Sequence, residues 1–185
     1  MSSCQSSQSR DSPSIGELRR NCDIWMYLES LRRPFEPLIQ SLFHFYWRFA
    51  RGLTLGVRAV VIDGVGRVFL VKHSYVAGWH LPGGGVEAGE TMMTALTREL
   101  REEGNIELGE QPDFFAIYFN RRASRRDHVG LYVVRSFHQS APPKPNHEII
   151  ARGFFAPDAL PEDTTRATRA RIAEVVQGRA IAELW

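Results

Sequence analysis

The sequence predicts an α/β fold in which strands fill the middle of the chain and helices interrupt and follow them. Between residues 53 and 155, short apolar and β-branched runs are separated by turn residues, as is typical of strands. One amphipathic helical pattern interrupts these runs, and another follows them near the C-terminus. Because strands and helices do not alternate regularly, the sequence does not predict a simple βαβ repeat.

Composition and charge predict one soluble globular domain with an N-terminal extension. The chain has 185 residues, of which 43% are apolar and 24% are charged. Its net charge of +2 argues against a general nucleic-acid coat or a membrane-surface protein. Both cysteines, Cys4 and Cys22, lie near the N-terminus, which excludes a disulfide framework for the domain. We therefore expect a cytoplasmic protein with neither membrane nor nucleic acid as partner.

The first 51 residues divide into two segments. Residues 1–33 are expected to form a disordered extension, since residues 1–14 in particular are rich in serine, glutamine and other polar residues. Residues 34–51 predict an amphipathic helix whose broad apolar arc includes Phe35, Leu42 and Phe49. We expect this apolar arc to pack either on the chain's own sheet or on the same helix of a second subunit in a homodimer. The sequence does not choose between these two partners. Residues 52–185 form the main domain.

The strands follow in order along the domain. Leu53–Asp63 and Arg67–His73 flank Gly64-Val65-Gly66, which predicts a hairpin turn. A short strand is expected at Trp79–Leu81, before a run of glycines. The remaining predicted strands are Phe114–Asn120, His128–Phe137 and Ile149–Phe155.

Two helices complete the predicted domain. The first runs from about Met92 to Glu103, with the Thr91 hydroxyl as its N-terminal cap. Its apolar face, which includes Leu96 and Leu100, is suited to docking on a sheet. The second helix spans Thr165–Gln177 and is followed by Gly178, a residue typical of helix ends.

Three carboxylates share one face of the first helix. Glu99, Glu102 and Glu103 stand at positions i, i+3 and i+4, so their like charges repel one another. Oxygen ligands of this kind suit a hard divalent cation such as Mg²⁺ or Mn²⁺. The preceding Gly83-Gly84-Gly85 run lets a ligand approach the backbone closely. Arg98 lies four residues before Glu102 and is placed to orient it.

Residues 84–106 resemble the Nudix box, G-x5-E-x7-R-E-U-x-E-E-x-G-U, in which U is apolar. The matching residues are Gly84, Glu90, Arg98, Glu99, Leu100, Glu102, Glu103 and Ile106. One position departs from the pattern, because Asn105 replaces the last glycine. That glycine usually ends the helix in a left-handed conformation, and asparagine is the next best residue there.

The resemblance implies a Nudix-type α/β/α sandwich around a mixed sheet, and hydrolysis of a nucleoside diphosphate linked to another moiety. It implies Mg²⁺ or Mn²⁺ as cofactor, with Glu99, Glu102, Glu103 and the Gly83 carbonyl as ligands. Glu90 and Arg98 then support these ligands. The general base is expected to be Glu148, at the start of the last strand, with Glu102 and Glu103 as the other candidates.

The substrate is expected to be a small nucleotide derivative. Arg126, in the arginine-rich segment before His128, is a candidate for contacting it, together with Gly84 and Gly85. A nucleotide, a nucleotide sugar and a dinucleotide all remain open. The alternative function is a catalytically silent regulatory module that binds a nucleotide. All the box carboxylates are present, which favours the enzyme.

Overall fold

The computed structural model describes residues 52–141, 143 and 147–185, and Leu53–Trp185 form one compact unit. The predicted extension at 1–33 and the predicted helix at 34–51 lie outside the described residues. The elements in order are β1 (Thr54–Val61), β2 (Val68–His73), β3 (Trp79–His80), α3 (Met92–Gly104), β4 (Ile106–Leu108), β5 (Asp113–Phe119), β6 (Asp127–Val134), β7 (Phe137–Gln139), β8 (Ile149–Phe155) and α4 (Arg166–Gln177).

The strands form three sheets where one mixed sheet was expected. In the first sheet, β6 lies between β1, which is parallel to it, and β5, which is antiparallel. In the second, β2 lies between β3 and β8 and is antiparallel to both. The third pairs β4 with β7. The α/β class is confirmed, and the mixed character belongs to the first sheet alone.

The turn of the predicted hairpin is present, but the prediction that β1 and β2 form a hairpin is wrong, because the two strands belong to different sheets. The turn itself forms, since the Asp63 N–H donates to the Arg67 carbonyl at 3.0 Å and Ile62 bridges to Val68. The two strands then enter different sheets. The reason is that β6 and the 82–86 segment bond the two edges of β1, while β3 and β8 bond those of β2.

The predicted strand at residues 128–137 is divided in two. β6 ends at Val134, and after Arg135 and Ser136 the chain continues as β7, which pairs with β4. The Ser136 carbonyl accepts a 3.0 Å hydrogen bond from the Gly109 N–H, which places this bend beside the chain that follows β4.

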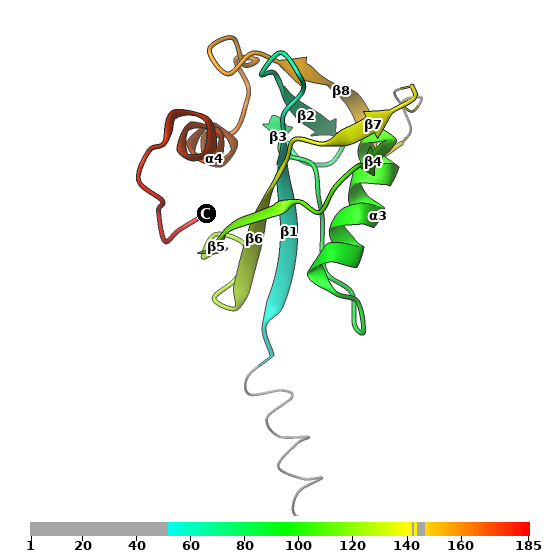
Figure 1. Cartoon of the computed structure of the whole chain (residues 1–185). Coiled ribbons are helices and arrows are strands. Elements are labelled where there is room, and N and C mark those ends of the chain that lie inside the picture. Colours follow the sequence, from blue (N-terminus) through cyan, green and yellow to red (C-terminus); the bar gives the residue numbers. More distant parts are fainter. Residues whose placement is uncertain (1–51, 142, 144–146) are drawn as a thin grey trace, which may run out of the picture. The chain divides into compact units, whose positions relative to one another are not determined.

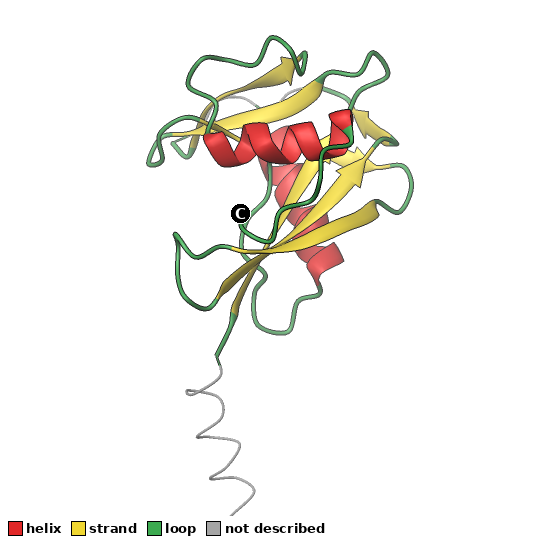
Figure 2. Cartoon of the chain, turned by 90° about the vertical axis from the view of Figure 1, so that its left-hand side faces the viewer, coloured by secondary structure: helices red, strands yellow, loops and turns green. Residues whose placement is uncertain are grey.

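The two helices cover opposite sides of the strands, as Figures 1 and 2 show. Alternate residues of β1 face the two sides, because side chains alternate along a strand. Val57 and Ala59 join a core cluster with Leu96 and Leu100 of α3. Val60 joins the other cluster, which includes Ile172 of α4. This arrangement agrees with the expected α/β/α layering.

Both helices begin and end as predicted. Thr91 caps α3 by accepting a 3.1 Å hydrogen bond from the Thr94 N–H. Asn105 ends that helix at φ 51° and ψ 39°, the left-handed conformation expected for the replaced glycine. Thr165 caps α4, and Gly178 ends it at φ 64°. Of the helices in the described ranges, neither is long and apolar enough to cross a membrane.

Candidate active site

A cleft of about 790 Å³ lies between the first half of β1, the start of β6, the 83–88 loop and α3. The described residues that line it carry five carboxylates, namely those of Glu87, Glu99, Glu103, Asp127 and Glu148. One guanidinium, that of Arg58, is the only Lys or Arg side chain among those lining residues. The cleft is therefore strongly anionic.

Backbone packing explains the glycine run on the wall of this cleft. The Val57 N–H of β1 donates to the Gly84 carbonyl at 2.9 Å, so the loop lies directly against the strand. Gly83 has φ +133°, and a Cβ there would overlap the Val57 carbonyl. A Cβ at position 84 would collide with the Glu99 carboxylate. From the sequence, we expect a ligand to approach the backbone of this glycine run closely. In the structure, it is the Glu99 carboxylate that lies against Gly84.

Glu103 is the buried acid of the site, with only 6% of its surface exposed. One of its oxygens accepts a 2.7 Å hydrogen bond from the Gly83 N–H. Burial raises the pKa of Glu103 to about 7, and the nearby charges of Glu99 and Glu148 act in the same direction. The Arg58 charge and the Gly83 N–H oppose this rise in pKa. Glu103 therefore titrates near neutral pH.

His73 lies beside Glu103, with its Nε2 at 3.4 Å from Oε1 of the acid. Burial lowers the pKa of His73, and the Arg58 and His80 charges lower it further. The imidazole is therefore neutral at neutral pH, and this approach is not an ion pair.

Neither His73 nor Arg58 was predicted as a site residue from the sequence. Arg58 was detectable in principle, because it is a lone charge inside an otherwise apolar strand. Its Nη1 donates to the Leu81 carbonyl at 2.9 Å, just before the glycine run. His73 ends β2 without a distinguishing pattern, and only the fold brings it to Glu103.

Arg98 bonds two carboxylates, those of Glu90 and Glu99, and Glu99 lines the cleft. It donates to both oxygens of Glu90 at 3.2 Å, to Glu99 at 2.7 Å and to the Gly85 carbonyl at 3.2 Å. These carboxylates raise the pKa of Arg98, and the Arg98 guanidinium lowers that of Glu90. Arg98 thus orients Glu99, while its distance to Glu102 is a longer 3.7 Å.

Two of the three carboxylates of α3 line the cleft. Glu99 and Glu103 line the cleft, whereas the Glu102 side chain is 62% exposed and is not among the lining residues. Over the described ranges, no group of three or more His, Cys, Asp or Glu side chains is assembled to hold a metal. Two carboxylates with water and substrate oxygens are nevertheless a donor set that Mg²⁺ commonly uses. The residues present therefore fit that ion.

Glu148 reaches the same cleft from the start of β8. The Tyr75 hydroxyl donates to its Oε1 at 3.0 Å, and the Ser74 N–H donates to its backbone carbonyl at 2.8 Å. Both Tyr75 and Glu148 line the cleft. Arg126 is exposed and is not a lining residue, although its neighbour Asp127 is. The fold thus brings the predicted base to the predicted ligands and leaves Arg126 outside the cleft.

The box helix, its glycine loop and the acidic cleft define a protein of the Nudix class. Residues 52–176 match the NUDIX domain, and the chain belongs to that family. A MutT-like protein of Streptomyces ambofaciens is 27% identical over 125 residues, which cover 68% of this chain and 78% of that relative. An RNA pyrophosphohydrolase of Legionella pneumophila is 37% identical over 59 residues, 32% of this chain. The match spans only 34% of that relative's length.

Solved structures agree with this fold. A MutT NUDIX hydrolase of Burkholderia pseudomallei superposes with a TM-score of 0.57 at 28% identity, covering 66% of this chain and 98% of that one. An ADP-ribose pyrophosphatase of Streptococcus suis superposes with a TM-score of 0.53 at 24% identity, covering 70% of this chain and 94% of that one. At 24% identity, the similarity to the Streptococcus suis structure supports the fold alone.

Proposed function

We propose that this protein is a divalent-metal-dependent hydrolase that cleaves the pyrophosphate linkage of a nucleoside diphosphate joined to another moiety. The observation that carries the proposal is the charge of the cleft, where five carboxylates face a single arginine. A pyrophosphate is itself anionic, so such a cleft repels it unless cations are bound as well. Family membership supports the same reaction.

Glu99 and Glu103 are the proposed metal ligands, together with the carbonyl oxygen of Gly83. Glu102 is a further candidate at the exposed edge of the same helix. A bound Mg²⁺ or Mn²⁺ supplies neutralisation of phosphate charge and a more acidic water. Arg98 fixes the Glu99 carboxylate, and the Gly83 N–H fixes that of Glu103. These bonds lower the cost of organising the ligands when a metal binds.

Glu148 is the proposed general base, which accepts a proton from the water that attacks phosphorus. Its carboxylate lines the cleft that Glu103 also lines, and Tyr75 orients it through the 3.0 Å hydrogen bond. Gly84 and Gly85 are proposed to face the substrate, since both line the cleft. Glu102 and Glu103 are the alternatives for the base.

The test is a panel of nucleotides incubated with Mg²⁺ or Mn²⁺. The panel includes nucleoside triphosphates, ADP-ribose, a UDP-sugar, a dinucleoside polyphosphate and a 5′-triphosphorylated RNA. Release of phosphate, pyrophosphate or nucleoside monophosphate is measured with and without EDTA. Hydrolysis that EDTA abolishes is expected for at least one compound. Binding of a nucleotide without any turnover would contradict the proposal and favour the regulatory module.

A further inference from the structure

Arg58 is a half-buried cation in the middle of β1, where it lines the cleft. Its face of the strand also carries Gly56, two residues earlier, because side chains alternate along a strand. Withdrawing part of a guanidinium from water is unfavourable unless polar groups take the place of that water. The partners of Arg58 therefore decide what this side chain does in the cleft.

One hydrogen bond fixes the Arg58 guanidinium, and its acceptor is a backbone group. Nη1 donates to the Leu81 carbonyl at 2.9 Å. In the described part of the chain, no ion pair joins Arg58 to a carboxylate, although five carboxylates line the same cleft. No nitrogen of Arg58 is a buried donor without a partner among those described residues. The guanidinium is therefore held in place while its other N–H groups stay accessible.

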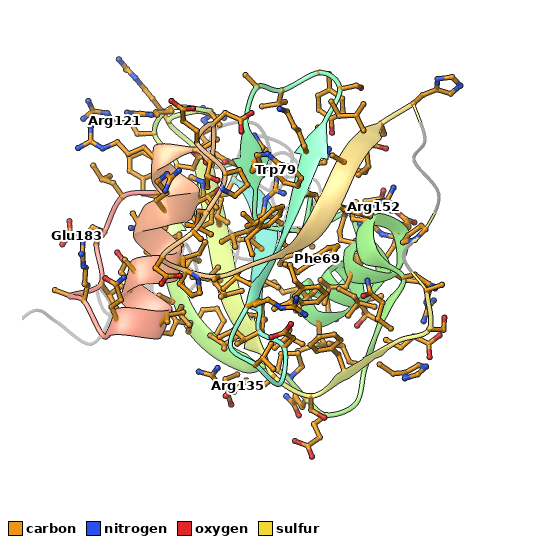
Figure 3. The ribbon with its side chains drawn as sticks, turned by 90° about the horizontal axis from the view of Figure 1, so that it is seen from above. Phe69, Trp79, Arg121, Arg135, Arg152 and Glu183 are labelled. Carbon is orange, nitrogen blue, oxygen red and sulfur yellow. The ribbon has the colours of Figure 1, made fainter. Side chains whose placement is uncertain are left out.

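Arg98 and Arg152 also lie close to the site, but the protein itself occupies each of them. Arg98 is bonded to two carboxylates. Arg152 donates from Nη1 to the Glu103 carbonyl at 2.7 Å, and Figure 3 shows its side chain beside α3. Neither is among the described residues that line the cleft. Of these three guanidinium groups, Arg58 is the one placed to meet an anion in the cleft.

The wall of the cleft next to Arg58 is made of backbone. Gly56 has no side chain, and the nearest atom that a Cβ there would meet is the Gly84 carbonyl oxygen at 3.3 Å. A Cβ at Gly85 would meet only open space. All three glycines line the cleft. A ligand can therefore approach this wall closely on the same face of β1 as the guanidinium.

We propose that Arg58 is a catalytic residue that donates hydrogen bonds to a phosphate oxygen of the substrate's pyrophosphate. The inference rests on the proposed function and adds a residue to it. Hydrogen bonds from a guanidinium to phosphate are charge-assisted, and the planar fork matches two oxygens. As water attacks phosphorus, a new P–O bond forms, and the bridging P–O bond breaks with its electron pair on the leaving oxygen. Arg58 stabilises the negative charge on phosphate and keeps its own proton.

A purely structural role for Arg58 makes a different prediction for metal binding. If the side chain only held the Leu81 carbonyl, its loss would loosen the adjoining glycine run and weaken binding of a metal at Gly83. As a phosphate contact, Arg58 instead repels a bound cation. Its charge opposes the rise in the pKa of Glu103, so its field reaches that proposed ligand. Removing this charge should leave metal affinity unchanged or increase it.

The first test is therefore a pair of binding measurements on Arg58→Gln. Titration with Mn²⁺ gives the metal affinity, at about pH 8.5 so that Glu103 is ionised. Imidodiphosphate, a pyrophosphate analogue with a nitrogen bridge, is then titrated in the presence of Mn²⁺. Its Kd should rise by about 10–100-fold, while Mn²⁺ binds at least as tightly as to the wild type. Arg101→Gln is the control, because Arg101 is exposed and outside the cleft lining.

Two results of this test would contradict the inference. Weaker binding of both Mn²⁺ and imidodiphosphate would assign Arg58 to holding Leu81. Unchanged imidodiphosphate binding would show that Arg58 does not contact phosphate. Arg58→Lys serves if thermal unfolding shows that the glutamine variant does not fold. Lysine loses the planar fork, so imidodiphosphate should bind about three- to tenfold more weakly with no loss of Mn²⁺ affinity, and wild-type binding of imidodiphosphate would overturn the inference.

Turnover tests the catalytic part of the inference, with whichever compound of the nucleotide panel the wild type hydrolyses. In Arg58→Gln, kcat should fall by at least about 100-fold in addition to the loss of binding, because the charge that Arg58 stabilises is greatest in the transition state. An unchanged kcat would reject the catalytic role. Absence of hydrolysis of every compound by the wild type, with imidodiphosphate binding that still depends on Arg58, would contradict the proposed function and support the phosphate contact.

Discussion

The buried carboxylate of Glu103, in the last turn of α3, accepts a 2.7 Å hydrogen bond from the backbone N–H of Gly83, 20 residues earlier in the chain. This bond ties the end of the helix to the glycine loop that precedes it. Both residues line the acidic cleft. One charge-assisted bond therefore sets the distance between two proposed ligand groups before any metal binds.

Glu103→Gln removes a proposed metal ligand, and Glu102→Gln removes a further candidate ligand. Each is expected to lower metal-dependent turnover by at least about 100-fold, since even changes beyond the ligands cost ~10–100-fold. Glu102 is exposed, so its substitution should leave the melting temperature unchanged. Steady-state kinetics and thermal unfolding measure the two effects. Glu107→Gln is the control, because Glu107 is also exposed and lies outside the cleft lining. Undiminished turnover in Glu103→Gln would remove it as a ligand.

Arg98→Lys is expected to lower metal affinity and turnover by about 10–100-fold. Lysine keeps the charge but loses the planar fork that reaches Glu90, Glu99 and the Gly85 carbonyl together. Titration with Mn²⁺ measures the affinity directly. Arg101→Lys, on the same helix and exposed, is the matched control. Wild-type Mn²⁺ affinity in Arg98→Lys would show that Glu99 needs no such orientation.

In the metal-free protein, Glu103 should contribute a loss of stability as the pH rises from about 4.5 to 7, whereas the lowered pKa of His73 contributes in the opposite direction below its ordinary value of 6.5. The pKa of Glu103 is about 7 in the folded protein, above its ordinary value of 4.5. The folded state therefore binds more protons than the unfolded state between these values, and its stability falls as the pH rises through 7. Urea unfolding in EDTA at several pH values measures the slope. Glu103→Gln should flatten this slope, and an unchanged slope in that variant would assign it to another group.

The buried ion pair of α4 is expected to support the fold rather than the chemistry. Arg171 is 2% exposed, and its Nη2 lies 2.6 Å from Oε1 of Glu174. The Tyr118 hydroxyl donates to the other Glu174 oxygen at 2.7 Å. Glu174→Ala leaves Arg171 buried without its carboxylate and should lower the free energy of unfolding by roughly 3–5 kcal/mol.

Tyr118→Phe removes only the hydroxyl that donates to Glu174. It should lower the free energy of unfolding by less, about 1.5–3 kcal/mol, because the ion pair between Arg171 and Glu174 persists. Chemical denaturation of both variants tests this order. A larger loss in Tyr118→Phe than in Glu174→Ala would show that the tyrosine, and not the ion pair, dominates this cluster.

Glu148→Gln should lower kcat by about 10²–10⁴-fold with a smaller change in KM, as expected for loss of a general base. Tyr75→Phe removes only the 3.0 Å hydrogen bond to Glu148 and should have a milder effect on kcat. Single-turnover kinetics with saturating metal separate this step from binding. Full activity in Glu148→Gln would transfer the role of base to Glu102 or Glu103.

Local patterns in the sequence determined the ends of the helices and the spacing of the box. The Thr91 cap, the left-handed Asn105 and the Gly178 terminator all depend on neighbours within one helical turn, and all three are confirmed. The apolar face of α3 follows from the same short-range periodicity, and Leu96 and Leu100 are fully buried. Such features are encoded within a few residues, so a sequence pattern is enough to predict them.

The partners of the strands and the grouping of the acids were decided only by the tertiary structure. β1 and β2 are neighbours along the chain, yet β1 pairs with β6, and β2 pairs with β3 and with the more distant β8. Glu99 and Glu103 meet Glu148, Arg58 and His73 in one cleft, while Glu102 stays outside it. Which strand edges remain free, and which side chains become buried, depends on the packing of all elements at once. That information is absent from any single stretch of residues.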